Sequence, residues 1–224
     1  MNKQYEIDRK LIYKYTKNNY INKIYKDWGV ELNGVFYKIN SNISVKECIF
    51  IHLLIKITKP KKVLEIGLAT GMSSMIILNA LNMFDGEILY SVDPFQKTQW
   101  NSVGLYNIDN VKKNIKHKLV EKLSDVAFDE FENNFFDMIL IDGPHDKMAV
   151  IGDINNTKRV LKINGIMILD DILHKGVAEA IKEVLINDTN YKRICINYDN
   201  IEKCNKNSFK KYNPVTMSAY IKLK

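Results

Sequence analysis

The sequence predicts an α/β fold with a mostly parallel sheet, and three observations support this. A short apolar strand, a glycine-containing loop and a helix follow one another over residues 62–81. Residues 135–141 form an almost continuous apolar run, and a second apolar run follows at 165–169 after one helical segment. Such runs are typical of strands that are buried on both faces of a parallel sheet. With 224 residues, the chain can bury one substantial core.

A helical cap is predicted before the sheet, over residues 1–59, and the sheet domain is expected over residues 60–224. Apolar residues recur at helical spacing in two early segments of the cap. Ser44 and Glu47 then match a capping box, in which each residue satisfies the other at the start of a helix. Pro60 follows this helix and ends it, because the residue before a proline disfavours helical geometry.

The first predicted strand, 62–66, leads into a loop that holds Gly67 and Gly71. Glycines let a backbone approach a ligand closely, and the N–H groups at the start of the following helix suit an anionic oxygen. Glu65 lies at the carboxyl end of the strand, where open α/β sheets bind their ligands. The alternative interpretation is that the two glycines only form a tight connection.

The second predicted strand, 87–92, ends in Asp93. Nucleoside-binding α/β folds place an acid at this position, where it accepts hydrogen bonds from the ribose hydroxyls. A polar loop containing Trp100 follows, and then a helix is predicted over 108–117 and a third strand over 117–123. Trp100 either lines a ligand site or anchors the loop to the core.

The fourth and fifth strands are the two apolar runs, and both end in acids. Asp142 follows the fourth strand, and Asp170 and Asp171 follow the fifth, with a crossover helix expected over about 148–161. Three carboxylates at one edge of a sheet repel one another unless they are protonated or bridged by a cation. Oxygen ligands suit Mg²⁺, or else Ca²⁺ or Mn²⁺, but not zinc. Alternatively, Asp171 caps the next helix and Asp170 faces solvent.

The last two strands are predicted at 191–196 and 217–223, with a mobile loop at 200–213 between them. The loop from Glu65 to Ser73 resembles motif I of class I S-adenosylmethionine-dependent methyltransferases. The whole of 44–224 is similar to their metal-dependent small-molecule O-methyltransferases, of the catechol, caffeoyl-CoA and macrolide-sugar types. The resemblance implies a Rossmann-like sheet of seven strands with the last strand antiparallel, and a first helix whose cap helps to close the cofactor pocket.

The resemblance also implies a role for each matching residue of the cofactor site. Glu65 would hold the amino group of the methionine portion of S-adenosylmethionine, and the Ser73 hydroxyl would meet its carboxylate. Asp93 would bind the ribose, and the turn at Leu123 and Ser124 would contact the adenine. The expected cofactor-binding residues are Glu65, Gly67, Leu68, Ala69, Gly71, Ser73, Asp93, Ser124 and Asp142.

The metal-dependent enzymes of this family hold their cation at positions that match Asp142, Asp170 and Asp171, and they place a base where this chain has His145. A bound cation lowers the pKa of a hydroxyl group, and a histidine, with a usual pKa near 6.5, can then remove its proton. The expected reaction is methyl transfer from S-adenosylmethionine to an oxygen of a small molecule, a sugar or another diol, with Mg²⁺ and with His145 as the catalytic residue.

Composition limits the remaining functions. The net charge of +7 raises the question of a nucleic-acid partner, but only three of the basic residues are arginines, which favour recognition of phosphates and bases. An RNA methyltransferase and a non-catalytic binding or structural protein that keeps the fold remain the alternatives. The first 43 residues match no family pattern and are expected to shape the acceptor pocket or the interface of a homodimer.

The expected location is the cytoplasm. The chain has no apolar run of about 18 residues that could span a membrane, and its polar start does not resemble a signal peptide. Its three cysteines, Cys48, Cys195 and Cys204, are scattered and are expected to be reduced thiols.

Overall fold

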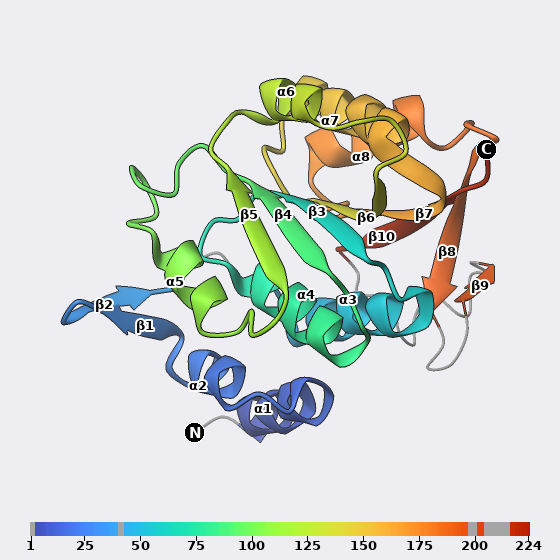
Figure 1. Cartoon of the computed structure of the whole chain (residues 1–224). Coiled ribbons are helices and arrows are strands. Elements are labelled where there is room, and N and C mark those ends of the chain that lie inside the picture. Colours follow the sequence, from blue (N-terminus) through green and yellow to red (C-terminus); the bar gives the residue numbers. More distant parts are fainter. Residues whose placement is uncertain (1–2, 40–42, 197–200, 204–215) are drawn as a thin grey trace.

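The computed structural model describes residues 3–39, 43–196, 201–203 and 216–224. Its main sheet has the strand order β5-β4-β3-β6-β7-β10-β8-β9 (Figure 1). The five strands from β5 to β7 in this order are parallel, β10 is antiparallel to both of its neighbours, and β9 is antiparallel to β8. The strands are β3 (Lys62–Ile66), β4 (Ile88–Val92), β5 (Lys116–Val120), β6 (Phe136–Ile141), β7 (Leu161–Leu169), β8 (Tyr191–Ile196), β9 (Ile201–Lys203) and β10 (Ser218–Lys222).

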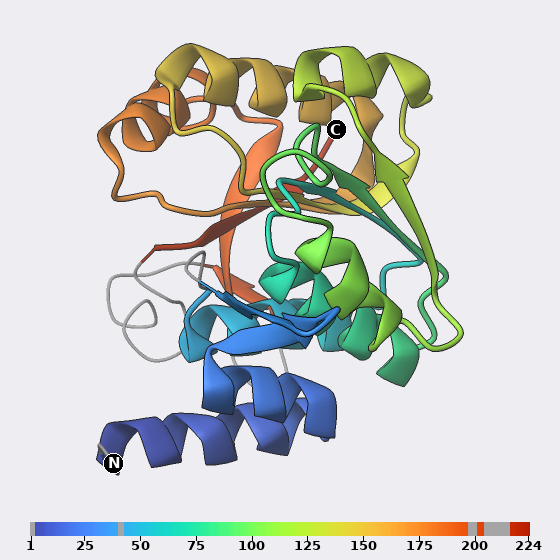
Figure 2. The same ribbon diagram turned by 90° about the vertical axis from the view of Figure 1, so that its left-hand side faces the viewer.

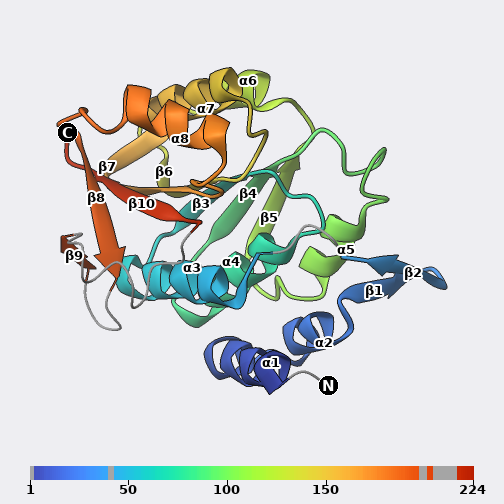
Figure 3. The same cartoon turned by 180° about the vertical axis from the view of Figure 1, so that it is seen from behind.

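Helices cover both faces of this sheet (Figures 1 and 3). A separate apolar core lies on each face. On one face lie α3 (Val45–Thr58), α4 (Met72–Met83) and α5 (Val103–Asp109). On the other face lie α6 (Ser124–Ala127), the short 3₁₀ helix η1 (Phe128–Glu130), α7 (Lys147–Val160) and α8 (Lys175–Val184). The expected Rossmann-like architecture with seven strands and an antiparallel last strand is confirmed, and β9 adds an eighth strand.

The N-terminal cap contains a hairpin in addition to the expected helices. Helices α1 (Lys3–Thr16) and α2 (Asn19–Asp27) form the outermost layer below the sheet (Figure 2). Strands β1 (Gly29–Leu32) and β2 (Val35–Lys38) follow and pair antiparallel. Asn33 and Gly34 join them with φ values of 54° and 77°. An Asn-Gly pair with both φ angles positive is the usual two-residue hairpin turn.

The cap is tied to the loop between β3 and α4 through one buried asparagine. The hydroxyl of Tyr20 in α2 donates a hydrogen bond of 2.7 Å to Oδ1 of Asn107, and Nδ2 of Asn107 donates one of 2.8 Å to the carbonyl oxygen of Thr70. The predicted capping box of α3 is present, because Ser44 N–H donates to Glu47 over 2.6 Å and Glu47 N–H donates to Ser44 Oγ over 3.3 Å. The bonds of Asn107 thus connect α2 to the loop, and the capping box fixes the start of α3.

The segment after the second strand differs from the prediction. The helix α5 ends at Asp109 and turns occupy the chain as far as β5, so the helix expected at 108–117 is wrong. The strand expected at 117–123 is present as β5 but ends at Val120. Val111 and Ile115 are buried, and their spacing suggested a helix. Lys113 between them has a φ of 45°, which a helix does not accept.

The hairpin of β8 and β9 also corrects two expectations. Residues 201–203 form a strand instead of a loop. The rest of the loop predicted at 200–213 lies outside the described residues. Cys48 is free and buried, as expected, whereas Cys195 is disulfide-bonded. Strand β9 runs antiparallel to β8 and pairs with it at Cys195. The spacing of the cysteines in the sequence did not predict this return of the chain or the disulfide. None of the described helices is long and apolar enough to cross a membrane.

Candidate active site

Two adjoining cavities lie at the carboxyl edge of the parallel strands. The larger, of about 830 Å³, is enclosed by the glycine loop after β3, the ends of β6 and β7, and residues of the N-terminal cap. The smaller, of about 300 Å³, lies beside the ends of β3 and β4 and the segment after β5. A ligand that spans both cavities must pass the residues that their walls share, which are Gly67, Ala69, Trp100, Asp142 and Gly143.

The loop between β3 and α4 approaches its neighbours so closely that two positions require glycine. Gly67 has a φ of +96°, and a Cβ atom there would lie 2.0 Å from the carbonyl oxygen of Asp142. Gly71 has a φ of +80°, and a Cβ atom there would lie 2.9 Å from the carbonyl oxygen of Gly104. Both conformations are strained for any residue with a side chain. The loop backbone therefore forms part of the cavity wall itself.

Helix α4 begins directly after this loop. Gly71 is its N-cap residue and supplies no side-chain hydrogen bond to the first turn. Met72 and Ser73 belong to that turn and line the larger cavity, as do Leu68 and Ala69 before them. Because the first N–H groups of a helix favour anionic oxygen atoms, this part of the cavity suits a carboxylate.

Glu65 lies beneath the loop and has no solvent exposure. Its carboxylate accepts hydrogen bonds from the hydroxyls of Ser73 and Ser74, and a third of 3.2 Å from Ser91. Burial raises the pKa of Glu65 to about 7, although the three serine hydroxyls favour the charged form. Of these four residues, Ser73 is the one that also lines the larger cavity.

Asp93 lines the smaller cavity together with Ser124, as the ribose and adenine assignments require. The Asp93 carboxylate is also held by the protein. Its Oδ2 accepts hydrogen bonds from the Ala69 N–H over 2.7 Å and from Gln96 Nε2 over 2.9 Å. Its Oδ1 accepts one of 2.7 Å from the Phe95 N–H. These bonds join the ends of β3 and β4 and fix the direction of the carboxylate.

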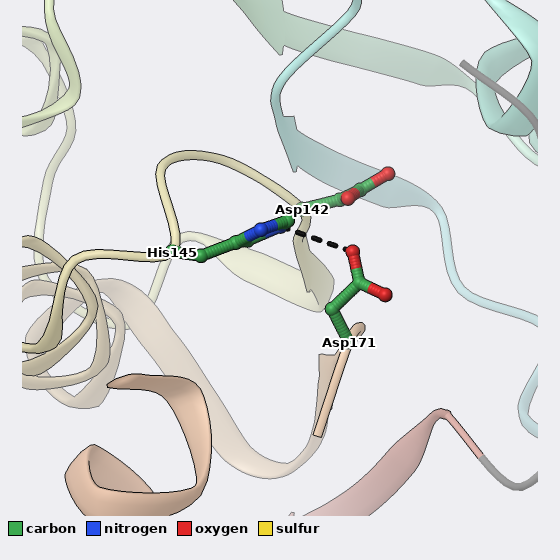
Figure 4. Close-up of side chains that lie close together, drawn as sticks. All are labelled: Asp142, His145 and Asp171. Atoms are coloured by element: carbon green, nitrogen blue, oxygen red, sulfur yellow. Dashed lines mark ion pairs between the residues drawn. The ribbon is translucent and has the colours of Figure 1, made fainter. Parts of the chain in front are cut away.

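The acids at the ends of β6 and β7 line the larger cavity. Asp142, His145 and Asp171 lie close together, with one potential ligand atom of each within 4.8 Å of the others (Figure 4). Nε2 of His145 lies 3.0 Å from Oδ2 of Asp171. Asp170 lines the same cavity but is outside this group, and its Oδ1 accepts a 2.7 Å hydrogen bond from the Asp171 N–H. The arrangement thus brings His145 to two of the three predicted metal ligands.

Mutual repulsion and burial make this cluster costly in its ionised form. Burial raises the pKa of Asp142 well above its usual range, and the charge of Asp170 adds to the effect. Burial also raises the pKa of Asp170 to about 7, and the charge of Glu47 is the next cause. Among the described residues that line the larger cavity, none is a lysine or an arginine. A positively charged ligand is therefore favoured there.

The N-terminal cap supplies the wall opposite the strand ends. Tyr25 and Trp28 from α2 and its C-cap line the larger cavity, together with Ser44 and Glu47 at the start of α3. The resemblance indicated that the start of α3 closes the pocket. Tyr25 and Trp28 were missed as site residues, because their spacing indicated only one apolar face of a helix. No signal in the sequence placed that face against the carboxylates.

Comparison of the sequence with known proteins finds similarity to methyltransferases over the segment that carries this site. A family model described as a methyltransferase domain matches residues 64–172, from the end of β3 to just beyond the Asp170-Asp171 pair. Over this segment, which is just under half of the chain, the protein is similar to methyltransferase domains. A flavonoid 3',5'-methyltransferase of Vitis vinifera is 28% identical over 154 residues, which cover 65% of this chain and 62% of the relative. The chain thus matches less than two thirds of the length of that relative.

Solved structures share the fold of the methyltransferase domain. An O-methyltransferase of Bacillus cereus in complex with SAH has a TM-score of 0.59 at 15% identity and covers 82% of this chain and 84% of its own. The O-methyltransferase TomG of Streptomyces achromogenes, in complex with SAM, has a TM-score of 0.61 at 13% identity, with 96% and 90% covered. Together with the family model, these matches confirm the resemblance to class I methyltransferases.

Proposed function

We propose that the protein transfers a methyl group from S-adenosylmethionine to an oxygen of a small hydroxylated molecule, such as a sugar or another diol. The observation that carries this proposal is the junction of the two cavities at Gly67 and Asp142, with the cofactor-type loop beside a cluster of carboxylates. The name of the Vitis relative refers to a flavonoid, which supports a small-molecule acceptor.

In this proposal the smaller cavity holds the nucleoside. Asp93 would accept hydrogen bonds from the ribose hydroxyls, and Ser124 would contact the adenine, since both line this cavity. The methionine portion would pass Gly67 into the larger cavity, where the first turn of α4 begins. The cap of residues 1–59 would then form the acceptor side of the larger cavity, with Tyr25 and Trp28 as its aromatic wall.

The carboxylates fit a divalent cation, because they crowd one cavity whose described lining contains no lysine or arginine. Asp142, Asp170 and Asp171 would hold the ion, and Mg²⁺ is the ion that such oxygen donors favour. A divalent cation supplies polarisation of an oxygen ligand and a lower pKa for its proton. The position of His145 next to Asp171 makes its imidazole a further donor for softer metals.

His145 would accept the proton of the acceptor hydroxyl. Its Nε2 faces Oδ2 of Asp171 at 3.0 Å, so a proton on Nε2 is shared with that carboxylate. Nδ1 is then the unprotonated nitrogen and the atom that takes the proton. A base positioned in this way contributes about 10²–10⁴ in rate, and orientation of the two reactants supplies the rest without a covalent enzyme intermediate.

Calorimetric titration with S-adenosylmethionine and S-adenosylhomocysteine tests the cofactor site, and release of S-adenosylhomocysteine from a panel of sugars and vicinal diols, with Mg²⁺ or with EDTA, tests the reaction. We expect binding of both ligands and Mg²⁺-dependent turnover of at least one acceptor. Absence of binding contradicts the proposal. Binding without turnover of any acceptor favours the non-catalytic alternative, and affinity for RNA that falls steeply with salt favours the RNA methyltransferase.

A further inference from the structure

Glu47 is a carboxylate of the larger cavity that the proposed reaction does not use. It lines this cavity although it is only 7% exposed. Its Oε2 accepts the 2.6 Å hydrogen bond from the Ser44 N–H that completes the capping box of α3. Its other oxygen, Oε1, has no hydrogen-bond or ion-pair partner among the described residues. A buried carboxylate with one free oxygen in a cavity suits a hydrogen-bond donor, and a positively charged donor binds it most strongly.

The capping box holds this carboxylate in place before any ligand binds. Ser44 and Glu47 each accept a hydrogen bond from the N–H group of the other, so the Glu47 side chain cannot turn away without loss of a bond at the start of α3. A side chain that is already fixed loses little conformational entropy when it binds a ligand. Capping accounts for Oε2 and leaves Oε1 available.

The cation of the proposed function does not account for Glu47. The described side chains whose potential ligand atoms lie within 4.8 Å of one another are those of Asp142, His145 and Asp171. Glu47 is outside this group, but its charge is one cause of the raised pKa of Asp170, so these two carboxylates repel each other. A divalent cation and the sulfonium of the cofactor bring three positive charges to the four carboxylates that line the cavity. One more positive charge on the acceptor would balance the fourth carboxylate.

An aromatic wall lies in the same cavity. Tyr25 and Trp28 line it from the cap, and their rings meet edge to face with centroids 5.4 Å apart. Tyr25 is buried, and its hydroxyl donates to the carbonyl oxygen of Ile43, whereas the indole of Trp28 is only half-buried. Glu47 lies near this wall, since its charge is one of the causes that raise the pKa of Tyr25. The face of an indole ring attracts a cation, as a carboxylate does.

We infer that the methyl acceptor is a hydroxylated amine, such as an amino sugar, whose ammonium group binds Oε1 of Glu47 beside the indole ring of Trp28. The inference rests on the proposed function and narrows its class of acceptor. The methyl group still passes to a hydroxyl oxygen, because a protonated amine has no lone pair with which to attack the sulfonium. The proton that leaves is that of the hydroxyl, and the amine keeps its charge in the product.

Matched pairs of acceptors isolate the ammonium group. Each amino sugar of a panel is compared with its N-acetyl derivative, which keeps the other hydroxyl groups but carries no positive charge. Binding to the protein loaded with S-adenosylhomocysteine and Mg²⁺ is followed by tryptophan fluorescence, because both tryptophans of the chain, Trp28 and Trp100, line the larger cavity. Turnover is followed by release of S-adenosylhomocysteine from S-adenosylmethionine.

Glu47→Gln is the informative variant, because glutamine preserves a capping box and removes only the charge. We expect the wild type to bind amino sugars about tenfold or more tightly than their N-acetyl derivatives, the scale of a hydrogen bond between charged groups. Glu47→Gln should lose this preference and change the affinity for S-adenosylhomocysteine by less than about twofold.

Two further variants test the aromatic wall and the specificity of the effect. Trp28→Leu, measured by calorimetry, should reduce the preference about threefold or more through loss of the cation–π contact. Glu31→Gln is the matched control, because it removes an exposed acid of the same cap that does not line the cavity, and it should keep the wild-type preference. Thermal unfolding checks that each variant is folded.

Wild-type protein that binds the N-acetyl derivatives as tightly as the amino sugars overturns the inference, and so does a loaded protein that binds no amino sugar. Mg²⁺-dependent turnover of neutral diols in either case leaves the proposed function standing. A preference in Glu47→Gln equal to that of the wild type also overturns the inference, because the ammonium group is then bound elsewhere. Absence of binding of S-adenosylhomocysteine overturns the proposed function, and the inference with it.

Discussion

Two groups of acids at the same edge of the sheet are held in opposite ways. Glu65 is enclosed by three serine hydroxyls and has no solvent exposure. Asp142, Asp170 and Asp171 line a cavity, and their neighbours there include one another and Glu47. A carboxylate that accepts hydrogen bonds from the protein has its partners within the fold. Carboxylates that crowd a cavity are instead stabilised in their ionised form most strongly by a positively charged ligand.

The strongest test of this contrast removes charge from the crowded group. We expect the double variant Asp170→Asn/Asp171→Asn to lower turnover with Mg²⁺ by about 10³-fold, because a metal ligand set contributes several kcal/mol to the transition state. Affinity for S-adenosylhomocysteine should change far less. The matched control is Asp146→Asn, an exposed acid whose capping role at α7 asparagine preserves. Unchanged turnover of every acceptor in the double variant ends the cation hypothesis.

Glu65 should reveal its burial through the pH dependence of stability. Its pKa in the folded chain is about 7, against an unfolded value of 4.5. Above pH 4.5 the unfolded chain releases the proton first, so stability from this group falls as the pH rises from 4.5 to about 7, by up to roughly 3 kcal/mol. Urea denaturation of the wild type and Glu65→Gln across this window measures the difference. Parallel pH curves for the two proteins would show that Glu65 is ionised at little cost.

Asp93 tests an acid that lies between these extremes, because it has protein donors and also lines a cavity. We expect Asp93→Ala to weaken S-adenosylhomocysteine by about tenfold to a hundredfold through loss of the acceptor for the ribose hydroxyls. Calorimetry gives the affinity, and Asp125→Ala, an exposed acid near the same cavity, is the control. Equal affinity in Asp93→Ala and the wild type removes the ribose assignment.

The smallest effect is expected on stability without metal. Asp170→Asn should raise the free energy of unfolding at pH 8 by at least about 1 kcal/mol when EDTA is present, because burial and the charge of Glu47 raise the pKa of Asp170 to about 7 and so disfavour its charged form. Urea denaturation measures this change, and Mg²⁺ should reverse its sign. A variant less stable than the wild type in EDTA would mean that Asp170 is favourably ionised in the fold.

The sequence was most informative where local pattern and chemistry coincide. The positions of Gly67 and Gly71, the capping box at Ser44, and the acids that end β4, β6 and β7 could all be predicted, because each depends on a short segment and on the direction of a parallel strand. The parallel sheet then brings these strand ends to one edge, as the confirmed fold requires.

Tertiary contacts explain what the sequence did not predict. Val111 and Ile115 lie in turns and are both buried, and their spacing of four residues is also that of one face of a helix. The hydrogen bonds of Glu65 depend on the register that sets it opposite Ser91, and the cap residues Tyr25 and Trp28 reach the cavity only through the packing of α2. None of these contacts produces a periodic pattern of residues in the sequence.

The close approach of Gly67 to the carbonyl oxygen of Asp142 limits how this protein could change its chemistry. Main chain at Gly67 and Asp142 forms part of the wall that the two cavities share, and a change of side chain does not remove it. Under the proposed function, variation in acceptor choice is therefore expected in the N-terminal segment, where Tyr25 and Trp28 line the larger cavity but not the smaller one. Homologues with new substrates should differ first around Tyr25 and Trp28.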